Sequence, residues 1–297
     1  MSDLRRTCFF CNKIIEEKKT LEHVIPNSLL GKLGIKEVKI TGRKETQYSR
    51  IKVPSHAICN SEFGSQYENR ILELLEDLDS LYESIKSEES GISMMYGPDE
   101  SVTAIVTTWL SKIYYGLFYY DLISTQDEDW KKICEYIVMG LNFKYVRSSY
   151  ENGHGFQLPS SLYVFKTNNS KTDLVTLVEP SSILLKIGSL TLILCICDGH
   201  LTKNYLNGEP LNRLRDWIRR EDENDVDFPS HKLALGEITA LRNCIPKTPK
   251  FISDDSQIIN MSLSTMVANP SEYYAIDEEQ LNHARMEILS ELNIRLR

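Results

Sequence analysis

Two pairs of side chains near the N-terminus have the types and spacing of zinc ligands. Cys8 and Cys11 are separated by two residues, and His56 and Cys59 repeat this spacing 45 residues after Cys11. A structural zinc ion takes four nitrogen or sulfur ligands in a tetrahedron, and a two-residue spacer lets one tight turn present two of them. We therefore predict a structural Zn²⁺ bound by all four residues. The alternative is that the two cysteines pack in a small core while His56 caps a helix.

Three further residues of catalytic type accompany these pairs. Glu22 and His23 lie between the pairs, and Asn60 follows Cys59 directly. Histidine titrates near neutrality and can activate water, whereas carboxylate and amide oxygens suit Mg²⁺ or Mn²⁺. A bound cation can offset the charge that develops during phosphodiester hydrolysis. Each residue also has an ordinary interpretation: His23 as a core residue, Glu22 as a solvated acid and Asn60 as a helix N-cap.

The order of these motifs resembles the HNH endonucleases, the ββα-metal group, in their zinc-bearing form. The chain has Cys-x-x-Cys, then Glu-His-Val-Ile-Pro at residues 22–26, then a second ligand pair followed by Asn-Ser-Glu-Phe-Gly at residues 60–64. The resemblance covers residues 8–70. It implies that His23 is the general base, that Glu22 and Asn60 hold a catalytic Mg²⁺ or Mn²⁺, and that zinc fixes the first β-hairpin against the following helix.

Some positions depart from the pattern of this family. Many members carry an Asn ahead of the second ligand pair, where this chain reads Gln-Tyr-Ser-Arg-Ile at residues 47–51, and many carry His or Lys where it has Gly64. Glu62 and Glu68 are candidates for additional metal contacts, although both are expected to face solvent. The departures leave open a second function, that of a non-catalytic, zinc-stabilised nucleic-acid-binding or adaptor protein.

Charge is divided unevenly along the chain, whose net charge is −8. Residues 1–60 contain 12 Lys and Arg against 6 Asp and Glu, whereas the remainder contains 22 against 36. A polyanion is attracted to the first segment and repelled by the second. We therefore expect DNA, and less readily RNA, to bind through basic residues of the first segment. The candidates for phosphate contact are Arg5, Arg6, Lys18, Lys19, Lys32, Lys36, Lys39, Arg43, Lys44, Arg50 and Lys52.

Periodicity and turn residues predict an α+β protein in two parts. Residues 1–90 would form a small zinc-stabilised ββα-metal nuclease domain, and residues 91–297 a larger α+β domain for regulation, recognition or dimerisation. Helices are predicted at 60–86, from Val102 with Asp99 or Ser101 as its cap, at 127–141, 203–220 and 277–297. Strands are predicted at 38–41, 50–53, 161–166, 173–178, 183–187 and 190–197, the last two joined by a turn at Gly188, and a linker at 87–98.

The remaining features indicate a cytoplasmic protein without a membrane segment. No apolar run approaches the roughly 20 residues that span a bilayer, and the N-terminus lacks the apolar core of a secretory signal. The seven cysteines do not resemble a disulfide framework, and the four outside the motifs are expected to be small buried side chains. The layout resembles bacterial restriction or anti-phage effectors, with a homodimer contact or regulatory partner in the C-terminal part. No catalytic constellation is recognisable around the later histidines, His154, His200, His231 and His283.

Overall fold

The computed structural model describes residues 4–16, 19–36, 46–87, 101–152, 160–166, 173–177 and 181–196, with short pieces at 252–253, 259–260, 279 and 283. Several predicted features lie outside these residues. They are the strand at 38–41, the linker from 88 onward, the helix at 203–220, most of the helix at 277–297, Cys197, Cys244, His154, His200, His231, Lys18, Lys39, Arg43 and Lys44.

The N-terminal part is built on two short antiparallel strands, β1 (Thr20–His23) and β2 (Lys52–Ser55). Their register places Glu22 opposite Val53 and His23 opposite Lys52. The strand β1 was not predicted, and β2 lies two residues beyond the predicted run at 50–53. Short helical segments surround the pair: η1 (Leu4–Arg6), α1 (Asn27–Lys32) and η2 (Tyr48–Arg50).

The helical region after β2 is not the single helix predicted for residues 60–86. It begins earlier with α2 (Ala57–Phe63), passes through a π-helical turn η3 (Gly64–Glu68), and continues as α3 (Asn69–Leu74). A new helix, α4 (Leu78–Ser87), then starts. The break occurs because the Asp77 carboxylate accepts a hydrogen bond from the Ser80 backbone N–H at 3.0 Å, which caps a new N-terminus.

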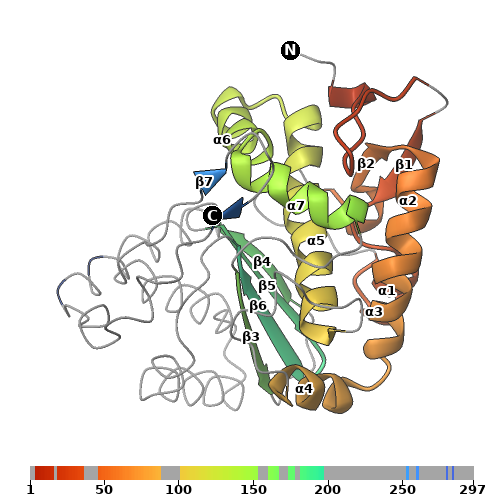
Figure 1. Cartoon of the computed structure of the whole chain (residues 1–297), viewed down its shortest axis with the longest axis vertical. Helices are drawn as coiled ribbons and strands as arrows, with labels where there is room; N and C mark the ends of the chain where they lie inside the picture. The colour runs from red at the N-terminus through yellow and green to blue at the C-terminus, as the bar shows by residue number, and fades with distance from the viewer. Residues whose placement is uncertain are drawn as a thin grey trace.

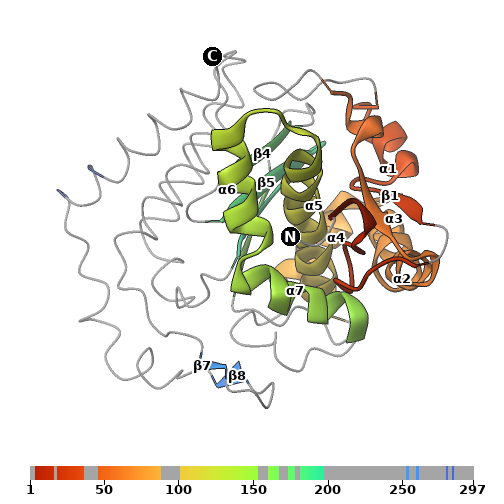
Figure 2. The ribbon, with the colours of Figure 1, turned by 90° about the horizontal axis from the view of Figure 1, so that it is seen from above.

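The long helix α5 (Val102–Ser124) lies between the N-terminal part and a β-sheet (Figures 1 and 2). Of the two caps predicted for it, Asp99 and Ser101, the second is confirmed, because the Ser101 hydroxyl accepts a hydrogen bond from the Ala104 backbone N–H at 3.2 Å. Two shorter helices, α6 (Glu128–Val138) and α7 (Leu141–Asn152), follow it. The first confirms the prediction for 127–141, although it ends three residues earlier, whereas α7 was not predicted.

An antiparallel sheet with the order β3-β6-β5-β4 packs beside α5. The four strands predicted between residues 161 and 197 are confirmed. Gly188 adopts the left-handed φ of +53° in the turn between the last two of them. The bounds are β3 (Ser161–Lys166), β4 (Asp173–Leu177), β5 (Ser182–Ile187) and β6 (Leu190–Cys195), with a further pair at β7 (Ile252–Ser253) and β8 (Ile259–Asn260).

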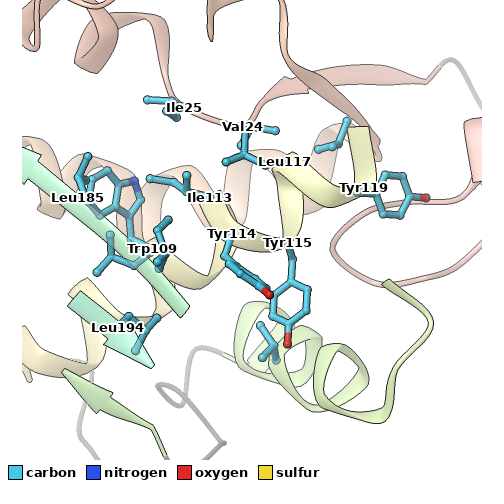
Figure 3. Close-up of a cluster of buried hydrophobic side chains, with 14 of the residues drawn as sticks. Val24, Ile25, Trp109, Ile113, Tyr114, Tyr115, Leu117, Tyr119, Leu185 and Leu194 are labelled. Atoms are coloured by element: carbon cyan, nitrogen blue, oxygen red, sulfur yellow. The ribbon is translucent and has the colours of Figure 1, made fainter. Parts of the chain in front are cut away.

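One hydrophobic cluster joins residues on both sides of the predicted boundary at residue 90. Figure 3 shows Val24 and Ile25 above α5, and Leu185 and Leu194 of the sheet beside Trp109. The mixed α+β class is therefore as predicted, while the two-domain division stays a prediction. None of the helices in the described part of the chain is long and apolar enough to cross a membrane.

The approach of α5 to the N-terminal part gives a first testable prediction. A Cβ added at Gly116 would lie 2.8 Å from both Val24 methyl groups, which are fully buried. We expect Gly116→Ala to lower the unfolding free energy by about 1–2 kcal/mol, because overpacking costs more than helix propensity returns. The matched control is Gly31→Ala in α1, where a Cβ meets nothing within 4 Å. In urea unfolding, this control should raise the unfolding free energy by roughly 0.5–1 kcal/mol. Equal effects of the two substitutions would contradict the close approach of α5 to Val24.

Candidate metal centre and catalytic residues

The first ligand pair lies on a tight turn closed by backbone hydrogen bonds. The Cys8 N–H donates to the Lys13 carbonyl and the Asn12 N–H donates to the Cys8 carbonyl, both at 2.9 Å. Asn12 has a left-handed φ of 59°, a conformation that asparagine tolerates better than most residues. The turn brings the Cys8 and Cys11 side chains to the same side, as the two-residue spacer predicts.

The second ligand pair meets the first at the beginning of α2. The four ligand atoms of Cys8, Cys11, His56 and Cys59 all lie within 4.8 Å of one another. His56 Nδ1 is 3.3 Å from Cys11 Sγ and 3.8 Å from Cys59 Sγ. Zinc bonds of about 2.3 Å to sulfur and 2.0 Å to nitrogen place such atoms about 3.5 Å apart in a tetrahedron. The group therefore has the composition and dimensions of a structural zinc site.

The orientation of His56 fits a metal ligand. Its Nε2–H donates to the Ile14 carbonyl at 3.3 Å, which leaves the lone pair of Nδ1 directed at the sulfur atoms. Its backbone N–H donates to Cys8 Sγ at 3.4 Å. His56 does occupy the N-cap position of α2, but its side chain makes no capping hydrogen bond. The imidazole thus serves the cysteine cluster and not the helix terminus.

The electrostatics of the cysteines also favour a bound cation. Burial raises the pKa of the Cys59 thiol, and the neighbouring Cys8 and Cys11 raise it further. The pKa of Cys11 is raised by burial and by Cys8, against a backbone hydrogen bond at Lys13 that lowers it. Without a cation, three adjacent thiolates are unfavourable. A zinc ion reverses this balance, since it binds the deprotonated sulfur atoms directly.

A buried arginine from α7 holds in place the turn that carries Cys8 and Cys11, which we call the knuckle turn. Arg147 donates from Nε to the Phe9 carbonyl at 2.9 Å and from Nη1 to the Asn12 amide oxygen at 2.8 Å. Its guanidinium lies over the Phe143 ring, 4.1 Å from the centroid. Sequence analysis did not identify Arg147, which is more than 130 residues away from its partners along the chain.

Glu22 and His23 lie next to each other on β1 and face opposite sides of the strand. Glu22 is buried, with 7% of its surface exposed, so its interpretation as a solvated acid is wrong. His23 is only partly buried, and Nε2 of its ring lies 3.0 Å from Nδ2 of Asn27, the first residue of α1. His23 is therefore not a fully enclosed core residue.

The surroundings of His23 favour its neutral form. Partial burial lowers the pKa of the imidazole below its usual 6.5, and the positive charges of Lys52 and Lys112 lower it further. Glu22 opposes these effects by raising the same pKa. Since the depression wins, the ring is uncharged at neutral pH and can accept a proton.

The Glu22 carboxylate is paired with a lysine of α5. Lys112 Nζ lies 2.6 Å from Glu22 Oε1 and 2.5 Å from Glu68 Oε1. The expectation that Glu68 faces solvent is wrong, because its side chain is only 13% exposed. The π turn η3 explains this position, since one extra residue rotates the following side chains by about 100° relative to an α-helix. Burial raises the pKa of Glu68, and the adjacent Lys112 lowers it.

Asn60 lies within α2 and is half-buried. Its backbone N–H donates to the His56 carbonyl at 3.1 Å, so it is an intrahelical residue and not the N-cap. The strand β2 leads almost directly into α2, which places Asn60 after the second zinc-ligand pair and on the helix that follows the paired strands. Glu62 is exposed, as expected.

The basic residues of the first segment differ in their surroundings. Lys32 forms an ion pair with Glu76 at 3.1 Å, and Arg5 donates to the Ile123 carbonyl at 3.2 Å. These two candidates for phosphate contact thus already bind protein groups. The other candidates in the described part of the chain are exposed or half-buried: Arg6, Lys19, Lys36, Arg50 and Lys52.

Comparison of the chain with protein-family models, curated proteins and solved structures found no match. The assignment of a function therefore rests on the geometry above and on the motifs in the sequence.

Proposed function

We propose that the chain is a metal-dependent endonuclease of the HNH type, which hydrolyses phosphodiester bonds of DNA with His23 as its general base. The observation that carries the proposal is the state of His23: half-exposed, uncharged at neutral pH, and in contact with Asn27 through Nε2. Nδ2–H of Asn27 donates to Nε2, so Nε2 is the ring nitrogen with the free electron pair. A water molecule that replaces Asn27 at this position would give its proton to Nε2.

Glu22 and Asn60 are the proposed ligands of the catalytic Mg²⁺ or Mn²⁺. Lys112 contacts Oε1 of Glu22, so Oε2 is the atom that this residue would offer to a metal. Asn60 would offer its amide oxygen. Such a cation would neutralise charge at the scissile phosphate and the leaving oxygen. Before water binds, Asn27 would hold the imidazole of the base in place.

The arrangement of elements supports this family assignment for the N-terminal part. Antiparallel strands β1 and β2 are followed by α2, and the Cys₃His group lies at the junction of β2 with α2. This is the ββα order that the motifs imply. Residues 1–90 would then be the nuclease domain, and residues 91–297 a domain for regulation, recognition or dimerisation in a bacterial restriction or anti-phage effector.

One observation favours the second candidate, a non-catalytic zinc-stabilised nucleic-acid-binding or adaptor protein. The ammonium of Lys112 already neutralises Glu22, the residue that a catalytic metal would require. In that case the zinc site would only organise the fold, and DNA or another partner would bind without being cut. The two candidates make opposite predictions for cleavage and the same prediction for zinc content.

The deciding experiment incubates the purified full chain with supercoiled plasmid, and in parallel with RNA, in Mg²⁺ or Mn²⁺. We expect wild-type protein to nick or linearise the plasmid. His23→Ala should cut about 100- to 10,000-fold more slowly, the usual contribution of a general base. The matched control is His283→Ala, which removes an exposed histidine outside the motifs. If no form of the protein cuts DNA or RNA, the nuclease proposal is refuted and the binding function takes its place.

The lowered pKa of His23 predicts the pH dependence of cleavage. The base must be unprotonated, so the rate should rise with pH through the pKa of His23 and stay constant above it. Because burial and Lys52 hold that pKa below 6.5, the acid limb should lie below pH 6.5. Lys52→Gln removes one of the positive charges near His23, so it should move the acid limb of the rate profile to higher pH. An acid limb centred above pH 7 in the wild-type rate profile would contradict the assignment of His23 as the base.

A further inference from the structure

We propose that Lys112 is a positioning residue of the candidate catalytic site, so that α5 completes a site whose other predicted members all lie in residues 8–70. This inference rests on the proposed function, because it concerns the same Glu22 and His23. If it holds, the nuclease site includes a residue from both predicted domains, since Lys112 lies beyond the predicted domain boundary at residue 90.

The three hydrogen bonds of the Lys112 ammonium carry the argument. Nζ donates to Glu22 Oε1 at 2.6 Å, to the His23 carbonyl at 2.7 Å and to Glu68 Oε1 at 2.5 Å. An ammonium group has three N–H donors, and each of them has an acceptor here. The side chain is fully buried, so these three partners replace the solvation that it loses.

Two of the three acceptors belong to the Glu22-His23 dipeptide itself. One is the side chain proposed to hold the metal, and the other is the main chain of the proposed base. Lys112 thus fixes the last two residues of β1 at two points. Glu68 supplies a second carboxylate, so the described cluster carries one positive and two negative charges when all three groups are ionised. Such a cluster orders the Glu22 carboxylate while retaining a net attraction for a cation.

The close approach of α5 to the same segment is an independent observation. Gly116 lies one helical turn after Lys112, on the same face of α5. The position of a Cβ at Gly116 is 2.8 Å from the methyl groups of Val24, the residue that follows His23. The helix therefore approaches residues 22–24 at two successive turns. At the first turn Lys112 donates hydrogen bonds to them, and at the second Gly116 has no side chain and leaves room for Val24.

The test compares Lys112→Met with Lys186→Met in the full-length protein. Lys186 is also fully buried, but it lies in the sheet on β5. Both substitutions remove a buried ammonium and should lower the melting temperature, by about 6–12 °C if a buried pair is broken. Only Lys112→Met should alter the candidate site. There kcat should fall about 10- to 100-fold while KM changes less than about twofold, since positioning is lost and not substrate binding.

A second measurement does not require any cleavage. The His23 imidazole is assigned by NMR as the signal missing in His23→Ala, and its titration is followed in each variant. With Lys112→Met its midpoint should rise by about 0.5–1 pH unit, because a positive charge is lost and Glu22 is left without its counter-ion. Lys186→Met should leave it unchanged. If wild-type protein does not cut nucleic acid, the proposed function fails, while this titration still decides the role of Lys112.

The outcomes are distinct. A folded Lys112→Met variant with wild-type His23 titration and wild-type kcat would overturn the proposal and leave Lys112 as a structural ion-pair partner. If Lys112→Met does not fold, the double variant Lys112→Met/Glu68→Gln removes one negative charge together with the positive one. That variant should fold, and its His23 titration should lie above that of Glu68→Gln alone by the same amount, about 0.5–1 pH unit, because these two proteins differ only at Lys112. Equal titrations of Glu68→Gln and the double variant would refute the proposal.

Discussion

Loss of about one equivalent of bound zinc and of several kcal/mol of unfolding free energy is the expected result of Cys8→Ser/Cys11→Ser. The substitution removes two of four ligands whose atoms lie within 4.8 Å of one another. Zinc contributes about 10–16 kcal/mol of apparent binding free energy to isolated zinc-finger peptides. The loss should be smaller here, because the Arg147 hydrogen bonds also hold the knuckle turn.

Metal analysis of the purified protein and denaturant unfolding with and without a chelator measure these effects. The control is Cys134→Ala/Cys195→Ala, which removes two buried cysteines that are not part of the ligand group. This control should lose stability through the cavities it creates but retain its zinc. Two results would contradict a structural role of the metal. One is wild-type stability in Cys8→Ser/Cys11→Ser, and the other is a wild-type protein that is folded and free of zinc.

The four residues of the candidate zinc site could be predicted from the sequence because their geometry is local. Each pair is set by a two-residue spacer, and the only long-range condition is that two turns meet. The partners Lys112, Glu68 and Arg147 could not be found in this way, since they reach the site through helix packing. The sequence did contain a signal for one of them. Lys112 is the only charged residue between Val102 and Tyr120, where all other residues are uncharged and most are apolar. A lone lysine in a buried helix requires a counter-charge.

The strand β1 was missed for a related reason. Its side-chain pattern is inverted, since Leu21 is 52% exposed while Glu22 is 7% exposed. Alternation read from hydrophobicity places the leucine inside and the glutamate outside. The reverse arrangement is stable because Lys112 neutralises the buried carboxylate. The strand thus departs from the usual rule at the dipeptide that the motifs single out for chemistry, where such departures are expected.

The helices show the same division between local and long-range information. The start of α5 was predicted correctly because a serine cap is a local signal, and the sheet strands because alternation and a glycine turn are local as well. The predicted helix over 60–86 was wrong at the π turn η3 and at the Asp77 cap. Hydrophobic spacing continues through both features, so periodicity alone does not reveal them.

Arg147→Met should lower the unfolding free energy by about 3 kcal/mol and accelerate the release of zinc. The change removes two hydrogen bonds from a buried charged donor, each worth about 1.5–3 kcal/mol, and leaves the Phe9 carbonyl and the Asn12 amide without that donor. Methionine keeps much of the apolar stem, which limits the contribution from packing alone. Urea unfolding measures the first effect, and transfer of zinc to a chromogenic chelator measures the second.

The matched control for this prediction is Lys144→Met, an exposed residue on the same helix α7, which should change stability by less than about 0.5 kcal/mol. The two measurements on Arg147→Met separate two roles of α7. A loss of stability with unchanged zinc release would mean that Arg147 only joins α7 to the N-terminal part. Faster release together with the loss of stability would mean that α7 holds the knuckle turn in its metal-binding conformation. Because the Arg147 partners flank Cys11 in the chain, we expect the second result.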